Sequence, residues 1–137
     1  MSDIFRQVVK TPSGMILPKV VADLTPEQLA DISNGCGPAS EMVKLVPDKI
    51  LGVNFNAACC GHDGCYGFGE DDEDKRVADR LFLYNLLAAV DGHCKARGII
   101  DRAQRVACRD AAWEYYKAVA DWGRSAFYAG KTEGCPS

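Results

Sequence analysis

Apolar residues recur at helical spacing through the second half of the chain and predict two long helices. In the segment 72–96 the apolar stripe consists of Val77, Leu81, Leu83, Tyr84, Leu87, Ala88 and Val90. In the segment 100–129 it consists of Val106, Ala111, Trp113, Tyr116, Val119, Ala120, Trp122 and Phe127. Positions spaced in this way share one face of a helix. Because Gly98 ends the first helix and Gly130 the second, we expect the two helices to pack antiparallel across a short turn.

A short helix is predicted from Thr25 to about Ser33. Thr25 is the N-cap of a capping box, with Pro26 at the first helical position and Gln28 three residues after the cap. The residues that follow, 34–38, are Asn-Gly-Cys-Gly-Pro, and these residue types end helices and form turns.

Another short helix is predicted further along the chain. It begins at a cap provided by Asn54 or Asn56, runs to about Tyr66 or Phe68, and is stopped by Gly67 and Gly69.

The remaining N-terminal residues, 1–24, carry no helical period and contain Pro12, Gly14 and Pro18. We interpret them as an extended arm in front of a domain that covers residues 25–137. Strict alternation of apolar and polar residues, which marks a strand, never lasts more than four residues. The predicted fold class is therefore all-α.

Composition and charge exclude several classes of protein. The 137 residues are 47% hydrophobic and 26% charged, which is typical of one folded domain and not of a disordered chain. The net charge of −3 argues against a nucleic-acid-binding protein, which would need a basic face. No apolar run approaches the roughly 18 to 20 residues of a transmembrane helix. The acidic run 70–74 lacks EF-hand spacing, and we interpret it as negative charge at a helix N-terminus.

The cysteine content points to an oxidising compartment. Seven cysteines in 137 residues favour disulfides, and hence a secreted or extracellular protein, although the odd number leaves at least one thiol unpaired within the chain. The first residues do not show the charged-then-apolar layout of a signal peptide.

The segment 59–66, Cys-Cys-Gly-His-Asp-Gly-Cys-Tyr, is the densest in chemically active side chains. On a helix His62 and Asp63 point about 100° apart, so each can face a different partner. The carboxylate of Asp63, together with backbone carbonyl groups of the glycine-rich loop 34–37, would form an oxygen site that suits Ca²⁺. A disulfide from Cys36 to one cysteine of the pair 59–60 would fix this loop to the helix.

A neutral His62 beside such a cation can act as the general base on a water molecule in ester hydrolysis. The imidazole then needs a carboxylate on its other nitrogen, and both Asp79 and Asp110 are candidates. We favour Asp79, because it shares a helical face with apolar residues, where a carboxylate needs a partner. Asp110 shares its face with Trp113, Glu114 and Lys117 and is expected to be more solvated.

These motifs resemble the secreted phospholipase A2 superfamily. The resemblance rests on residues 59–66 and on Asn-Gly-Cys-Gly at 34–37. The segment 108–116, Cys-Arg-Asp-Ala-Ala-Trp-Glu-Tyr-Tyr, and the spacing from Asp79 to Phe82 resemble the compact prokaryotic and fungal branch. The resemblance covers about residues 34–122.

The resemblance implies a phospholipase A2-like fold and Ca²⁺-dependent hydrolysis of the sn-2 ester of glycerophospholipids, which releases a fatty acid and a lysophospholipid. The substrate would lie at the surface of a phospholipid membrane or micelle. His62 would be the water-activating base, Asp79 its partner and Tyr66 a hydrogen-bonding support. The implied calcium ligands are the carboxylate of Asp63, the carbonyl groups of Gly35 and Gly37, and the side-chain oxygen of Asn34.

The same resemblance implies two disulfides, Cys36–Cys59 and Cys94–Cys108, the second of which would link the two long helices. We further expect Cys65 to pair with Cys135, since Cys65 shares a helix with Cys60 and a bond between those two would constrain little. Cys60 would then be the free thiol.

The chain also departs from the pattern of the animal enzymes. Only one residue separates the cysteine pair from His62, where the animal enzymes have two, so Cys59 matches the loop-bonded cysteine and Cys60 is extra. Pro38 and Ala39 stand where the animal enzymes have a further glycine, so the third carbonyl ligand has no match.

Two alternatives compete with this interpretation. A zinc site would use Cys59, Cys60, His62 and Cys65. It is disfavoured, because Cys59 and Cys65 lie about 9 Å apart along a helix and zinc–sulfur bonds are about 2.3 Å long. The other alternative is a phospholipase-like binding protein or toxin-type module without catalysis. Such a protein usually lacks the His or the Asp, and this chain has both.

Overall fold

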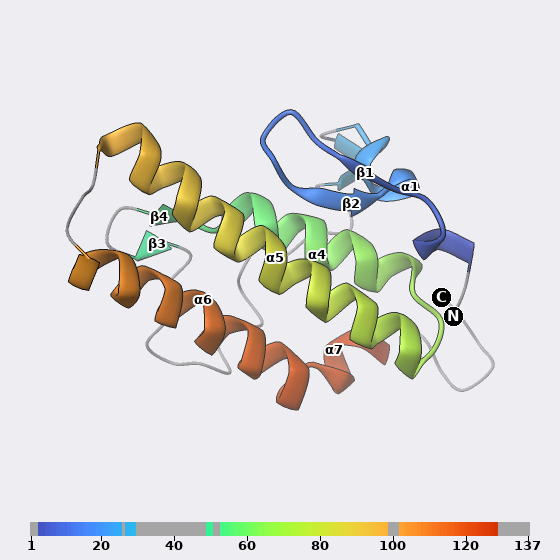
Figure 1. Cartoon of the computed structure of the whole chain (residues 1–137). Coiled ribbons are helices and arrows are strands. Elements are labelled where there is room, and N and C mark those ends of the chain that lie inside the picture. Colours follow the sequence, from blue (N-terminus) through green and yellow to red (C-terminus); the bar gives the residue numbers. More distant parts are fainter. Residues whose placement is uncertain (1–2, 26, 30–48, 51–52, 99–101, 129–137) are drawn as a thin grey trace.

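Three helices form the body of the molecule in the computed structural model, which describes residues 3–25, 27–29, 49–50, 53–98 and 102–128 (Figure 1). They are α4 (Asn56–Phe68), α5 (Asp72–Arg97) and α6 (Arg102–Trp122), and the short α7 (Arg124–Tyr128) follows. Helix α5 contacts α4 and also packs antiparallel against α6. The mostly helical architecture and the long antiparallel pair are as predicted. In the described segments, no helix is both long and apolar enough to cross a membrane.

Both ends of α5 follow from local sequence. Asp71 is the N-cap, and its carboxylate accepts a 2.8 Å hydrogen bond from the backbone N–H of Asp74. Acidic residues fill the first turn, where they complement the positive end of the helix macrodipole. Gly98 ends the helix in the left-handed region at φ 62°, which favours glycine. The interpretation of the acidic run as helix-start charge is thus confirmed.

Helix α4 begins and ends close to the predicted positions, but its cap differs. Phe55 is the N-cap and has no side-chain capping bond. Asn54 instead accepts a 2.8 Å hydrogen bond from the backbone N–H of Asn56, within the turn that leads into the helix. Gly69 is the C-cap, as predicted, whereas Gly67, the other predicted stop, lies inside the helix.

The capping box at Thr25 is present in full. The backbone N–H of Thr25 donates to the Gln28 side chain over 2.9 Å, and the backbone N–H of Gln28 donates to Thr25 Oγ1 over 3.1 Å. Residues 27–29 are helical. The predicted end of this helix near Ser33 lies outside the described residues.

Short strands, which the sequence pattern did not predict, accompany the helices. Strands β1 (Val8–Lys10) and β2 (Ile16–Pro18) pair antiparallel, and so do β3 (Lys49–Ile50) and β4 (Val53–Asn54). Strands of two or three residues are too short to show an alternation of apolar and polar positions, which is why the pattern missed them.

The N-terminal residues also contain a 3-10 helix, η1 (Asp3–Phe5), and a single helical turn, α1 (Lys19–Ala22). They share a buried cluster with the helices, to which they contribute Phe5, Leu17 and Val21. The Asn85 side chain on α5 joins the arm to the body: it accepts a 2.7 Å hydrogen bond from Ile16 N–H and donates a 3.0 Å bond to Ile16 O.

Glycines on α4 allow the arm to approach closely. A Cβ added at Gly61 would lie 2.8 Å from Leu17 Cδ2, and one at Gly64 would lie 2.7 Å from Val21 Cγ1. Both distances are shorter than real Cβ contacts, so a larger residue at either position would force these side chains of the arm to shift.

The last predicted helix, 100–129, is divided in the structure. Helix α6 ends at Trp122, Gly123 forms a turn, and α7 begins at Arg124. A Cβ added at Gly123 would lie 2.4 Å from Val119 O and 2.8 Å from Tyr66 Oη. The expectation of one continuous helix is therefore wrong, and the break lies where the backbone passes against Tyr66. The predicted end at Gly130 lies outside the described residues.

Candidate active site

Two buried side chains from neighbouring helices form the centre of the site. His62 on α4 and Asp79 on α5 are joined by a 2.8 Å hydrogen bond between Nε2 and Oδ1, and their side chains are only 5% and 4% exposed. Asp110, the other candidate partner, is exposed on α6. The predicted contact between His62 and Asp79 is therefore confirmed, as is the preference for Asp79 over Asp110.

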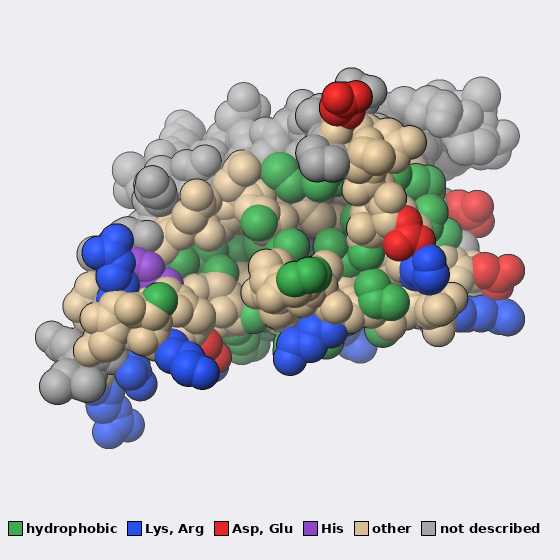
Figure 2. Space-filling model, turned by 90° about the horizontal axis from the view of Figure 1, so that it is seen from above, with side chains coloured by type: hydrophobic (Ala, Val, Ile, Leu, Met, Phe, Trp, Pro, Cys, Tyr) green, Lys and Arg blue, Asp and Glu red, His purple; other side chains and the backbone are tan. Residues whose placement is uncertain are grey.

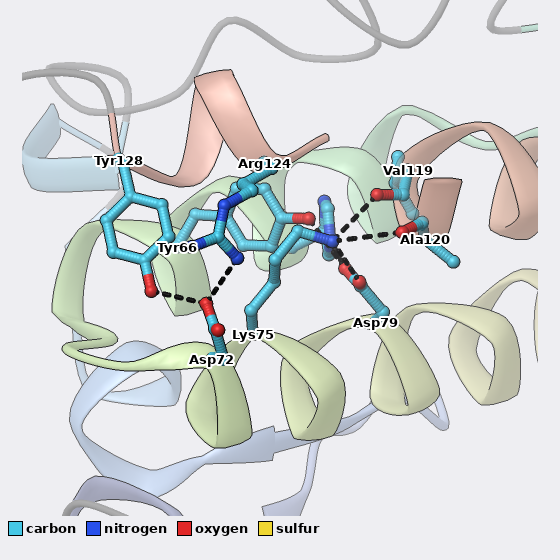
Figure 3. A network of polar contacts seen from close by, with 9 residues as sticks. Tyr66, Asp72, Lys75, Asp79, Val119, Ala120, Arg124 and Tyr128 are labelled. Atoms are coloured by element: carbon cyan, nitrogen blue, oxygen red, sulfur yellow. Dashed lines mark hydrogen bonds and ion pairs between the residues drawn. The ribbon is translucent and has the colours of Figure 1, made fainter. Parts of the chain in front are cut away.

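Asp79 accepts two further hydrogen bonds from buried donors (Figure 3). Tyr66 Oη donates to Oδ1 over 2.7 Å, and Lys75 Nζ donates to Oδ2 over 2.8 Å. Burial by itself would raise the pKa of Asp79, but the hydrogen bond and charge of His62, with the bonds from Lys75 and Tyr66, outweigh it and lower the pKa below its ordinary value. The carboxylate is thus ionised at neutral pH and accepts a hydrogen bond from the Nε2–H group of His62.

Lys75 is a member of the site that sequence reasoning missed. Its side chain is buried, and besides Asp79 it donates to the backbone oxygens of Val119 over 2.9 Å and Ala120 over 3.4 Å. A buried ammonium group is costly unless it is paired and hydrogen-bonded, and here it has three acceptors. The available signal was the i, i+4 spacing of Lys75 and Asp79, which usually marks a pair on a helix surface.

Aromatic rings fix the orientation of the imidazole. The His62 ring stacks on Phe82 at a centroid distance of 4.3 Å and an angle of 25°, and it lies 4.1 Å from the Tyr66 ring. With Nε2 held by Asp79, the other nitrogen, Nδ1, makes no hydrogen bond to any side chain or backbone group in the described part of the chain. The tautomer that donates from Nε2 therefore leaves an Nδ1 lone pair for a proton.

Tyr66 holds the Asp79 carboxylate through the hydrogen bond from its hydroxyl group. Burial raises its pKa, and the charge of Asp79 and the hydrogen bond to that carboxylate raise it further, so the hydroxyl stays protonated as a donor. Its ring packs edge-on against Phe127 of α7 at 5.0 Å. The predicted supporting position of Tyr66 agrees with this geometry.

A second polar cluster fastens α7 to the start of α5 (Figure 3). Arg124 and Tyr128 both donate to Asp72 Oδ1, over 2.6 Å and 2.5 Å. The hydrogen bond from Tyr128, followed by the bond and charge of Arg124, lowers the pKa of the exposed Asp72 carboxyl. This cluster holds α7, and with it Phe127, against the α4–α5 pair.

Only one of the four implied calcium ligands is described. Asp63 lies next to His62 on α4 and is half-buried, and its carboxylate charge contributes to the raised pKa of Tyr66. A carboxylate oxygen is a ligand of the kind that Ca²⁺ prefers. Asn34, Gly35 and Gly37 lie outside the described residues. Among the residues that the structure does describe, no three His, Cys, Asp or Glu side chains are arranged to hold a metal ion.

The cysteines differ in part from expectation. Cys59 is disulfide-bonded, while Cys36, its predicted partner, lies outside the described residues. Cys60 is a free thiol, as expected. Cys65 is also free, so the expected bond to Cys135 is wrong. Burial, followed by the charge of Asp79, raises the pKa of the Cys65 thiol to about 12.

The disulfide that was expected to link the two long helices is also absent. Cys94 and Cys108 are free, fully buried thiols in one apolar cluster between α5 and α6. Burial raises the pKa of Cys108, and the neighbouring Cys94 raises it further. The two residues thus pack as small apolar side chains, and the helix pair is held by the core itself.

The arrangement of these residues is suited to general-base chemistry. A histidine has one nitrogen fixed by an ionised carboxylate and the other available for a proton, and that carboxylate is in turn held by Tyr66 and Lys75. Comparison with known proteins adds no relative: no protein-family model, no curated protein and no solved structure matches the chain.

Proposed function

We propose that the protein is a calcium-dependent phospholipase A2, with a phospholipase A2-like fold, that hydrolyses the sn-2 ester of glycerophospholipids. The observation that carries the proposal is the buried 2.8 Å hydrogen bond between His62 Nε2 and Asp79 Oδ1. It is the contact that the resemblance to secreted phospholipases A2 implies. The chain around it, residues 59–66, carries the motif on which that resemblance rests.

In the proposed reaction His62 Nδ1 accepts a proton from a water molecule while the water oxygen attacks the sn-2 carbonyl carbon. Asp79 stabilises the resulting imidazolium through Nε2 and keeps the ring in its tautomer. The imidazolium then returns its proton to the departing oxygen of the lysophospholipid as the ester bond breaks. Fatty acid and lysophospholipid are released, and His62 is neutral again.

Tyr66 and Lys75 act on Asp79 and not on the substrate. Each donates one hydrogen bond to the carboxylate, so the carboxylate cannot rotate away from the imidazole. Their positions on α4 and α5 also mean that the packing of these two helices fixes the whole set.

The implied calcium site fits the donor chemistry of this chain. Asp63 would supply a carboxylate beside His62, and Asn34, Gly35 and Gly37 would supply further oxygens. Bound Ca²⁺ would polarise the ester carbonyl and stabilise the negative charge that develops on its oxygen. We further propose that the protein works outside the cell, at the surface of phospholipid membranes or micelles, as the resemblance to secreted phospholipases A2 implies.

The deciding experiment uses a phospholipid whose sn-1 and sn-2 chains differ in length, assayed with Ca²⁺ and with excess chelator. We expect release of the sn-2 chain only with Ca²⁺, and loss of this release in His62→Gln. The matched control is His93→Gln, which changes the chain's other histidine, half-buried further along α5, and should keep full activity. Full activity in chelator would remove the metal from the proposal.

The same experiment distinguishes the proposed enzyme from the alternative, a non-catalytic binding protein. If the folded protein binds phospholipid vesicles but releases no fatty acid under any condition, the non-catalytic binding protein replaces the enzyme. Calorimetric titration with Ca²⁺ tests the ligand role: Asp63→Asn should weaken calcium binding while thermal unfolding without calcium stays close to that of the parent.

A further inference from the structure

A cavity of about 380 Å³ lies between α5 and α6, far from the catalytic centre. Its lining residues are Val90, Asp91, Cys94, Lys95, Arg105 and Arg109. On α5 these residues follow Asp79 by at least eleven positions, which is roughly 16 Å or more along the helix axis. The volume is in the range of pockets that bind small ligands, about 300 to 1,000 Å³.

The cavity combines an apolar floor with a charged rim. Val90 and Cys94 are 1% and 4% exposed and form the buried part. Arg109 on α6 donates to Asp91 on α5 over 3.1 Å, and this pair fixes one side of the rim. Lys95 and Arg105 complete the lining, so three cations face one carboxylate and the formal charge of the lining is +2.

The positive charge of the lining is opposite in sign to the net charge of the whole chain, which is −3. Between residues 91 and 109 the sequence has five basic side chains, Lys95, Arg97, Arg102, Arg105 and Arg109, against Asp91 and Asp101. Figure 2 shows Lys and Arg side chains gathered at one end of the molecule, at the left, where α5 ends and α6 begins in Figure 1.

Helix electrostatics explains only part of this cluster. Lys95 lies in the last turn of α5, where a positive charge complements the macrodipole. Arg105 lies at the start of α6, which has no acidic residue in its first turn, and there a positive charge is unfavourable. The macrodipole therefore does not account for the cations of α6, and an anion between them and Lys95 would be attracted by all three.

We propose that the cavity between α5 and α6 binds a phosphate group, held by Lys95, Arg105 and Arg109. Guanidinium groups bind phosphate oxygens through paired, charge-assisted hydrogen bonds, and a lysine adds a point charge. The group would come either from free phosphate or from the headgroup of a phospholipid. The proposal does not depend on the proposed function, because the cavity shares no residue with the catalytic centre.

The test measures binding of inorganic phosphate to the full chain by calorimetry. We expect saturable binding that weakens about tenfold in Arg105→Gln, which removes one cation from the lining. The matched control, Arg80→Gln, removes the same charge from an exposed position on α5 outside the cavity and should bind within about twofold of the parent. His62→Gln should bind phosphate normally, so failure of the catalytic proposal would not affect this result.

A second arm uses sedimentation with vesicles of phosphatidylglycerol. Binding of vesicles but not of inorganic phosphate, with the same loss in Arg105→Gln and not in Arg80→Gln, would assign the site to a lipid headgroup. Lys95→Gln replaces Arg105→Gln if the latter does not fold. Equal binding by the cavity variants and the Arg80→Gln control, or no binding in either arm, would overturn the proposal.

Discussion

Lys75 and Asp79 lie one helical turn apart on α5, and the lysine ammonium donates to Oδ2 while Oδ1 faces His62. The carboxylate therefore divides its charge between a permanent cation and an imidazole that becomes a cation during the proposed reaction. Because the ammonium offsets part of the carboxylate charge, it weakens the attraction of Asp79 for a protonated His62.

Replacing Lys75 by Met should therefore shift the acid limb of the pH–rate profile. Without the ammonium, Asp79 holds the imidazolium more strongly, so a higher pH is needed to obtain the neutral base. The reason is the Coulomb repulsion between two cations on either side of one carboxylate, which the substitution removes. The measurement is kcat/KM against pH.

Lys75→Arg is the control, since it keeps the charge and its acid limb should stay near that of the parent. Both substitutions disturb the hydrogen bond from Lys75 Nζ to Val119 O. We expect Lys75→Met to lower the free energy of unfolding by about 3 kcal/mol. A Lys75→Met profile that is lower at every pH but unshifted would mean that Lys75 only supports the fold.

Asp79→Asn should reduce kcat by a factor on the order of 10³ to 10⁴, because an amide can present its N–H to the imidazole and favour the wrong tautomer. Asp110→Asn removes the same charge from an exposed position on α6 and should have little effect. Single-turnover hydrolysis of the mixed-chain phospholipid measures both. Equal losses in the two variants would exclude a specific role for Asp79.

The lowered pKa of Asp79 also predicts how stability depends on pH. The unfolded chain takes up the Asp79 proton at a higher pH than the folded one, so the stabilising contribution is complete above the ordinary pKa and is lost as the pH falls below it. As the pH falls below the ordinary carboxyl pKa, the unfolding free energy of the parent should thus fall more steeply than that of Asp79→Asn. Urea unfolding at several pH values measures this, and parallel curves would contradict it.

The sequence alone predicted those features that depend on neighbouring residues. The ends of α5 at Asp71 and Gly98 follow from capping chemistry, and the capping box at Thr25 is a local motif. The contact between His62 and Asp79 could be predicted because a carboxylate on an apolar helical face needs a buried partner.

Features that depend on distant segments were missed. Lys75 is buried only because the carbonyl groups at the end of α6 lie above it, and no pattern within α5 indicates them. The same holds for Asn85, which binds the backbone of Ile16, 69 positions away. The disulfide Cys94–Cys108 was inferred from the resemblance, and both residues are free thiols in the structure.

The free cysteines should differ sharply in reactivity toward iodoacetamide. Cys60 is partly exposed, whereas Cys65, Cys94 and Cys108 are buried. Because thiolates react and burial disfavours them, we expect fast labelling of Cys60 in the native protein and labelling of Cys65, Cys94 and Cys108 only after unfolding without reductant. Mass spectrometry of the digest identifies the sites, and in Cys60→Ser the buried Cys65, Cys94 and Cys108 should still label only after unfolding. If two of these three buried cysteines stayed unlabelled after unfolding, that pair would be oxidised.

Two glycine-to-alanine substitutions should have opposite effects on stability. A Cβ at Gly123 would lie 2.8 Å from Tyr66 Oη and 2.4 Å from Val119 O, so Gly123→Ala must displace the hydroxyl that donates to Asp79 or the end of α6. We expect a loss of about 1 to 3 kcal/mol in unfolding free energy and a reduced kcat.

Gly92→Ala is the control for this change. Gly92 lies within α5, and an added Cβ would meet no atom within 4 Å. Alanine there should stabilise the protein by about 0.5 to 1 kcal/mol without changing activity, since it lowers the entropy of the unfolded chain and favours the helix. Thermal unfolding and the hydrolysis assay measure both variants. If Gly123→Ala kept the activity and stability of the parent, the added methyl group would have been accommodated without displacing Tyr66 or the end of α6. The contact between the α6–α7 turn and Tyr66 would then not be needed to position Asp79.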